Sequence, residues 1–278
     1  MFWSKVAIVG ESAGRLLVIG GAEELHPGRE TILERFVALA GGPEARIAIV
    51  ATATTDPGPR ETEYREVFLR LGAGEVEPVR LTSREDANSD DAVARLATAT
   101  GVFFTGGDQR RITNALGGSR VDSLLHAQLA RPDGLRVLAG TSAGAAMMSG
   151  TMIVGGSDAP VGTTCVDIGS GLEFLSGVLI DMHFAERGRL NRLLSATAMY
   201  PHALGLGIDE DTAIEVYADR FEVLGSGSVT VIDAGRASHI GTPAEGDGPI
   251  ALCGVQLHVL PAGYGFALTE RRPEPRPG

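Results

Sequence analysis

The sequence predicts an α/β fold built on one mostly parallel sheet, with helices on both faces in three layers. Through the first two thirds of the chain, short apolar runs alternate with segments whose apolar residues recur every three to four positions. Continuous apolar runs are typical of strands covered on both faces, and strand–helix alternation indicates parallel pairing. With 278 residues, 44% of them hydrophobic and 21% charged, the chain can bury a large core. We therefore expect a single domain spanning residues 1–278.

The expected elements follow the order of repeated strand–helix units. In the segment 29–40, for example, Ile32, Leu33 and Phe36 recur near the helical period. Strands are predicted over 15–19, 45–50, 76–81, 101–104 and 136–139, and helices over 29–40, 61–71 and 90–98, with one or two more helices before the strand at 136–139.

The pattern changes after about residue 210. Short strands over 213–216, 220–223 and 228–232 are separated by turn residues, which predicts a short antiparallel extension packed on the main sheet. Residues 242–249 form a Gly/Pro-rich loop. The final residues, 271–278, are rich in proline and charge, and we expect an extended or disordered tail.

Composition excludes several classes of partner. A formal net charge of −11 argues against nucleic acid, whose binding depends on basic contacts to phosphate. No apolar run reaches transmembrane length, and the first 20 residues, which include Glu11 and Arg15, make a poor signal peptide. Cys165 and Cys253 lack metal-ligand spacing, which favours a reducing compartment, although a single disulfide between them stays open. We expect a cytoplasmic protein that does not bind membranes.

Residues 140–144, Gly-Thr-Ser-Ala-Gly, stand between a predicted strand and a run of helix formers over 143–148. This G-x-S-x-G pattern is typical of a nucleophile elbow, in which small neighbours tolerate a strained turn that exposes the serine hydroxyl. Ser142 is therefore a candidate nucleophile. The alternative is a plain strand-to-helix turn, because the pattern arises by chance in a chain with 38 glycines.

A serine nucleophile needs a base, which a third group orients. His183 follows the apolar run 177–180, and Glu210 follows the apolar run 205–208. Asp209 and Glu210 point to opposite sides, so only one of them can face the histidine. Taken singly, the histidine is more often satisfied by local hydrogen bonds and the acidic pair more often a solvated turn. The order Ser, His, Glu also differs from that of the α/β-hydrolases.

Two further clusters lie beside these candidates. Arg187, Arg189 and Arg192 form either a solvated helix face or a group that binds carboxylates through paired N–H donors. In the loop 105–109, the backbone N–H groups offer an oxyanion hole, and Gln109 offers both a donor and an acceptor. Alternatively, or in addition, this loop is a tight turn with Asp108 as a helix N-cap.

Together, these stretches resemble the cyanophycinases, of the dipeptidase E-like serine peptidases, whose fold is related to class I glutamine amidotransferases. That family hydrolyses cyanophycin, a poly-aspartate that carries arginine on each β-carboxyl group, and releases β-aspartyl-arginine dipeptides. The matching stretches are residues 17–23, 104–109, 140–145, 181–184 with the Arg-x-Arg-x-x-Arg that follows, and 207–213.

The resemblance implies that Ser142 is the nucleophile, His183 the general base and acid, and Glu210 the orienting carboxylate. It also implies a homodimer. We further predict acyl-enzyme chemistry without metal or organic cofactor, with an oxyanion hole at the N–H groups of Gly107 and Ala143. Substrate-binding positions fall on Gln109, Asp181, Met182, Arg187, Arg189 and Arg192. The acids Glu23, Glu24, Asp108 and Asp181 are candidates for binding the substrate's guanidinium groups.

One position departs from the family pattern, because Met182 stands where the family has glutamine. An apolar thioether cannot replace a substrate-binding amide, so we expect Met182 to alter substrate placement; the alternative is a side chain that only packs. Two other functions stay open: a dipeptidase for small peptides with N-terminal aspartyl or isoaspartyl residues, and a non-catalytic protein that binds cyanophycin.

Overall fold

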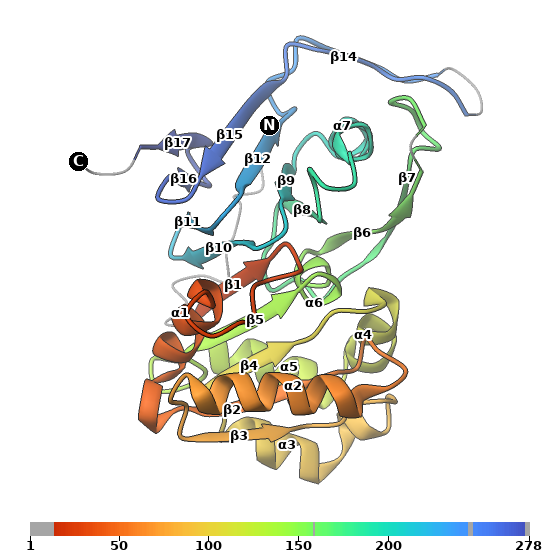
Figure 1. Cartoon of the computed structure of the whole chain (residues 1–278). Coiled ribbons are helices and arrows are strands. Elements are labelled where there is room, and N and C mark those ends of the chain that lie inside the picture. The colour runs from red at the N-terminus through yellow and green to blue at the C-terminus, as the bar shows by residue number, and fades with distance from the viewer. Residues whose placement is uncertain (1–13, 158, 244–246, 276–278) are drawn as a thin grey trace.

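The computed structural model describes residues 14–157, 159–243 and 247–275. Within these ranges, a nine-stranded sheet forms the centre of the molecule (Figure 1). Five of its strands are parallel, and four antiparallel strands extend one edge. In order across the sheet they are β17 (Arg272–Glu274), β16 (Gly265–Ala267), β11 (Arg220–Gly225), β10 (Thr212–Tyr217), β1 (Arg15–Ile19), β5 (Val137–Thr141), β4 (Gly101–Phe104), β2 (Arg46–Val50) and β3 (Glu75–Pro78).

Helices cover both faces of the parallel part, which confirms the predicted fold class. One core cluster joins two helices to the sheet through residues such as Phe36, Phe68 and Phe103, and another joins the helices of the opposite face. Helices α1 (Thr31–Ala40) and α2 (Pro57–Arg70) lie on one face, and α3 (Asp90–Ala97), α4 (Gln109–Leu116) and α5 (Arg120–Leu129) on the other, with short 3₁₀ turns at Gly42–Glu44 and Asp86–Asn88.

Side-chain caps explain where three of these helices begin. Ser89, Asp108 and Ser119 each accept a hydrogen bond from a backbone N–H in the first turn of the helix that follows. The predicted role of Asp108 as an N-cap is confirmed. Helix α2 begins at Pro57, four residues earlier than predicted, because proline is tolerated in a first turn whose N–H groups need no helical acceptor.

The chain also forms a second sheet, which the sequence analysis did not predict. In order it contains β15 (Gln256–Pro261), β12 (Ser228–Asp233), β9 (Leu204–Ile208) and β8 (Val178–Met182), with β8 and β9 parallel. The two strands that precede His183 and Glu210 therefore belong to this sheet and not to the main one. Apolar runs look alike in either sheet, so the sequence pattern does not reveal which neighbour a strand pairs with.

Three smaller elements surround the second sheet (Figure 1). Helix α7 (Leu190–Met199) packs on it through Leu193 and Ala196, which belong to one apolar cluster with Leu179 and Ile232. The elements are α7 (Leu190–Met199), the hairpin of β6 (Thr151–Gly156) and β7 (Val166–Ser170), and the hairpin of β13 (His239–Gly241) and β14 (Ala251–Cys253).

The C-terminal part agrees with the prediction in part. Strands β10 and β11 form the predicted antiparallel extension at the edge of the main sheet, but β12 joins the second sheet. The tail is ordered as far as it is described: β17 pairs with β16, and Arg271 forms an ion pair with buried Asp233 at 2.5 Å. Residues 244–246 and 276–278, parts of the predicted loop and tail, lie outside the described residues.

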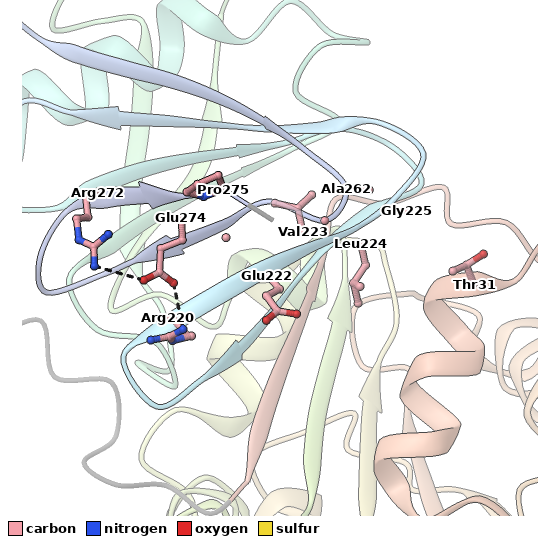
Figure 2. Close-up of a pocket in the computed structure, with 12 residues that line it drawn as sticks. Thr31, Arg220, Glu222, Val223, Leu224, Gly225, Ala262, Arg272, Glu274 and Pro275 are labelled. Carbon is pink, nitrogen blue, oxygen red and sulfur yellow. Dashed lines mark ion pairs between the residues drawn. The ribbon is translucent and has the colours of Figure 1, made fainter. Parts of the chain in front are cut away.

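A cavity of about 790 Å³ lies at this extended edge, beside β11, β16 and β17 (Figure 2). Both of its arginines pair with Glu274, Arg220 at 3.2 Å and Arg272 at 3.7 Å. None of the residues Ser142, His183 and Glu210 lines this cavity.

Cys165 and Cys253 are both free thiols, so they form no disulfide with each other. No described helix is long and apolar enough to cross a membrane.

The main sheet carries a buried ion-pair cluster around Glu215 of β10. This side chain is almost fully buried and accepts hydrogen bonds from Arg15 and from Arg35, the latter at 2.6 and 2.9 Å. Burial alone would raise the pKa of Glu215, but the hydrogen bonds from Arg35 and Arg15 outweigh it and hold the pKa below its ordinary value of 4.5.

We expect Glu215→Gln to lower the free energy of unfolding by about 2 kcal/mol at neutral pH, because charged hydrogen bonds are lost while both arginines stay partly exposed. The advantage of the wild type should be complete above pH 4.5 and should vanish as the pH falls through the lowered pKa of the folded state. Urea unfolding of both proteins across this range measures the difference. Equal stabilities at neutral pH would contradict the expectation.

Candidate active site

Ser142 occupies a strained turn at the end of β5. Its backbone has φ 51° and ψ −108°, outside the regions that a serine ordinarily adopts, and α6 (Ala143–Ala146) begins directly after it. The side chain is partly exposed while the preceding residue, Thr141, is buried. This is the geometry of a nucleophile elbow, in which the turn lifts the hydroxyl above the sheet.

The structure brings Ser142, His183 and Glu210 into one hydrogen-bonded chain. Ser142 Oγ lies 2.9 Å from His183 Nε2, and His183 Nδ1 lies 2.6 Å from Glu210 Oε1. When Nδ1 donates to the carboxylate, Nε2 is left to accept from the serine hydroxyl. The imidazole is mostly buried and Glu210 is about one third exposed, so the histidine is shielded between two partly exposed residues.

Asp209, which directly follows β9, turns away from His183, as predicted for one member of the acidic pair. Its carboxylate accepts hydrogen bonds from the Ala185 N–H at 3.1 Å, and from the Ser228 N–H and hydroxyl at 3.0 and 2.8 Å. Asp209 therefore anchors the turn after His183 to β12, and Glu210 is the carboxylate that reaches the imidazole.

The carboxyl end of β1 connects the three segments that carry these side chains. The Ile19 carbonyl accepts from the Ser142 N–H at 3.0 Å, and the Gly20 carbonyl accepts from the His183 N–H at 2.9 Å. The Gly21 carbonyl accepts from the N–H of Asp211, the residue after Glu210, at 2.9 Å. Three successive carbonyls thus set the relative positions of segments from two sheets.

Gly21 must be glycine for the histidine to occupy its place. A Cβ on Gly21 would lie 2.3 Å from His183 Cε1 and 2.6 Å from Nε2, and the backbone φ of 104° disfavours any side chain. The imidazole ring therefore packs directly on the Gly21 backbone. The Gly-Gly pair stands out in the sequence only as part of a motif, and nothing in that motif predicts its contact with the histidine.

The loop 105–109 lies against the serine, at the end of β4. A Cβ on Gly106 would be 3.5 Å from Ser142 Cβ, and the Gly107 backbone is held against the Ala53 carbonyl with φ 143°. The N–H of Ala143 is the first in α6 and has no acceptor within the helix. The two N–H groups assigned to the oxyanion hole thus belong to segments that flank Ser142.

The arginine cluster is divided between a buried and an exposed part. Asp181 is fully buried and binds Arg192 through both oxygens, with Nε at 2.9 Å from Oδ2, and it also contacts Arg189 at 3.4 Å. Burial lowers the pKa of Arg189; Asp181 partly offsets this effect, and Arg192 and Arg187 add to it. The Asp181 carboxylate therefore balances part of the positive charge of Arg189 and Arg192. Because Asp181 is buried, it does not fit the expected contact with substrate.

The exposed part of the cluster borders a cavity. Arg187 lies in the turn before α7 and not on a helix face, which was one of the two alternatives for it, and its side chain is exposed. The cavity has a volume of about 500 Å³, and arginines are its charged residues. It is lined by Gly156, Ser157, Arg187, Gly188, Arg189, Asn191 and Arg192.

Two other residues that were expected to contact the substrate, Gln109 and Met182, instead interact with other parts of the protein. The Gln109 amide donates hydrogen bonds to the carbonyls of Ile153 and Val154, at 3.2 and 3.1 Å, and thereby joins α4 to β6. Met182 is 6% exposed and belongs to the main apolar core cluster. Its burial favours the alternative that the methionine packs, because a side chain so enclosed presents little surface to a substrate.

Comparison with known proteins identifies the family. The model of "Peptidase family S51" matches residues 16–224, a range that contains Ser142, His183 and Glu210. The chain belongs to peptidase family S51. As a member of this family it is a serine-type peptidase, which agrees with the resemblance inferred from the sequence motifs.

Several curated relatives of this S51 peptidase bear the name cyanophycinase. The protein from Nostoc sp. is 39% identical over 259 residues, covering 92% of this chain and 86% of the relative. The protein from Geminocystis herdmanii is 37% identical over 268 residues, covering 95% of this chain and 96% of the relative. The similarity therefore extends over nearly the whole length of both proteins.

Solved structures show the same fold at lower identity. A peptidase from an acI-B1 Actinobacterium superposes with a TM-score of 0.66 at 20% identity, over 93% of this chain and 98% of that one. A putative peptidase E protein from Listeria monocytogenes gives a TM-score of 0.53 at 13% identity, over 77% of this chain and 99% of that one.

We expect Gly21→Ala to lower kcat roughly 100-fold, because the new methyl group must displace the His183 ring from Ser142. Gly28→Ala is the matched control: its φ of 82° imposes similar backbone strain, but a Cβ there meets nothing within 4 Å. Steady-state kinetics and thermal unfolding of both variants separate the two effects. Equal kcat values for the two variants would contradict the role assigned to Gly21.

Proposed function

We propose that this S51 peptidase is an exopeptidase that hydrolyses cyanophycin and releases β-aspartyl-arginine dipeptides. The observation that carries the proposal is the hydrogen-bonded chain from Ser142 Oγ through His183 to Glu210, with contacts of 2.9 and 2.6 Å. The choice of substrate rests on the relatives named cyanophycinase and on the cavity that is lined by the arginines shortly after His183 in the sequence.

In the first half of the reaction, Ser142 Oγ attacks the backbone carbonyl of an aspartyl residue, while His183 Nε2 takes the hydroxyl proton. Glu210 keeps Nδ1 protonated and stabilises the imidazolium that forms. The negative charge on the carbonyl oxygen is stabilised by the N–H groups of Gly107 and Ala143. His183 then protonates the leaving amine, and the acyl group stays on Ser142.

In the second half, a water molecule attacks the acyl-enzyme with His183 as base. The acyl fragment leaves with a new carboxylate, and the serine hydroxyl is regenerated. No step requires a metal or an organic cofactor. Residues other than the three catalytic ones have supporting roles: Gln109 fixes β6, and Asp181 holds Arg189 and Arg192 in place.

The substrate carries carboxylates as well as guanidinium groups, so its binding requires a cationic surface. Arg187 is the exposed cation of the 500 Å³ cavity, and Arg189 lines the same cavity while Asp181 holds its guanidinium. Paired N–H donors of arginine match the planar carboxylate of the polymer's C-terminal end or side chains. The two chains of a homodimer would each carry a complete site in this proposal.

The first test is mass spectrometry of the products after incubation of the wild type and Ser142→Ala with purified cyanophycin. We expect β-aspartyl-arginine from the wild type, and a kcat lower by several orders of magnitude in the variant, because triad members act as a unit. Near-wild-type activity of Ser142→Ala would remove this serine from the mechanism. A wild type that leaves cyanophycin intact but cleaves short N-terminal aspartyl or isoaspartyl peptides would favour the dipeptidase alternative.

Substrate binding by the arginine cavity has its own test. We expect Arg187→Ala to raise KM for cyanophycin about tenfold at nearly constant kcat, because a charged hydrogen bond made in both ground and transition states is lost. Arg131→Ala is the control for the change of net charge, since Arg131 is exposed just after α5 and its side chain pairs with Asp133. Parallel changes in KM for both variants would argue against a specific site.

A further inference from the structure

A buried carboxylate that the proposed mechanism does not use lies two residues after Gly21. Glu23 is 6% exposed, and no ion pair formed within the described ranges includes it. Its Oε1 accepts a hydrogen bond from the Tyr64 hydroxyl at 2.5 Å, and its Oε2 accepts one from the Thr141 hydroxyl at 2.5 Å. A carboxylate buried without a cation is costly, and these two charge-assisted hydrogen bonds are its compensation.

Both partners of Glu23 belong to rigid elements. Tyr64 lies on α2 and packs against Phe103 and Phe68, with ring centroids 4.7 and 5.8 Å away. Burial, together with the neighbouring Glu23 charge, raises the pKa of Tyr64, so its hydroxyl stays protonated as a donor. The carboxylate is therefore fixed from one side by an aromatic cluster in the core.

Thr141 is the partner that connects Glu23 to the reaction. It is the last residue of β5, is buried, and directly precedes Ser142, whose backbone lies in the strained region described above. A strained conformation persists only where its surroundings determine it from several sides. The Ser142 N–H is bound to the Ile19 carbonyl, and the Thr141 side chain supplies a second attachment at the same turn.

We propose that Glu23 is a positioning residue for the nucleophile: its carboxylate binds the Thr141 hydroxyl, holds the end of β5 against α2, and keeps Ser142 Oγ in line with His183 Nε2. The inference rests on the proposed role of Ser142 but not on the identity of the substrate. It assigns to the Thr141 side chain a function that the elbow pattern alone, which requires only small neighbours, does not give.

The test compares Thr141→Val, which removes the hydroxyl at nearly constant shape, with Thr141→Ser, which keeps it. We expect Thr141→Val to lower kcat on cyanophycin between about tenfold and 100-fold with little change in KM, and Thr141→Ser to restore most of the loss. Glu23→Gln should behave like Thr141→Val. The rate of Ser142 modification by a fluorophosphonate should fall by a similar factor in the two impaired variants, since it reports the reactivity of the serine without any substrate.

Thr197→Val is the matched control, because Thr197 is fully buried on α7 and its hydroxyl binds the carbonyls of Leu193 and Leu194. It should lose stability without loss of kcat or labelling rate. A Thr141→Val variant with the kcat and labelling rate of the wild type would overturn the proposal. If Thr197→Val lowered kcat and the labelling rate as much as Thr141→Val does, the proposal would be overturned as well.

Failure of the proposed function gives a different result. If the wild type is labelled at Ser142 but leaves cyanophycin intact, the substrate assignment fails, and the labelling rates of the variants still decide the role of Glu23. If the wild type is neither labelled nor active, Ser142 is not a reactive nucleophile and the proposal for Glu23 is overturned with it.

Discussion

The site depends on the three backbone carbonyls of residues 19–21, at the carboxyl end of β1. Ile19, Gly20 and Gly21 present three successive carbonyls, which accept from the N–H groups of Ser142, His183 and Asp211. Each of these segments comes from a different strand end, and two of them belong to another sheet. Hydrogen bonds from one short, rigid segment are therefore what brings a serine, a histidine and a carboxylate to fixed relative positions.

The same segments store backbone strain, and the surrounding core keeps it from relaxing. Ser142, His183 and Asp211 all have positive φ, at 51°, 50° and 45°, which is uncommon for residues with side chains. Such conformations cost of order 1–3 kcal/mol each and persist only where packing and hydrogen bonds impose them. In this chain the β1 carbonyls and the close packing of the His183 ring on Gly21 supply that constraint.

Sequence reasoning located the candidate triad because each member follows an apolar run that ends in a small or polar residue. Side chains from distant parts of a chain meet where strands end, so the sequence predicts that Ser142, His183 and Glu210 lie close together, and the family resemblance predicts their roles. The structure brings the three side chains into hydrogen-bond contact. The division into two sheets could not be predicted, because the apolar residues at 177–180 and 205–208 do not indicate which strands they pair with. The pairing of Asp181 with Arg192 was missed for a related reason: the turn over residues 184–189 brings them together, and the sequence does not show where this turn ends and α7 begins.

The central claim is that Ser142 attacks an aspartyl carbonyl while the N–H groups of Gly107 and Ala143 bind the resulting oxyanion. The most direct measurement is a crystal structure of the protein with an aspartyl aldehyde that carries arginine on its β-carboxyl group, because such an aldehyde adds reversibly to a serine hydroxyl. The account predicts a hemiacetal on Ser142 Oγ, with its oxygen about 3 Å from both N–H groups. An unreacted aldehyde in the site, or a hemiacetal oxygen that contacts neither N–H group, would contradict it.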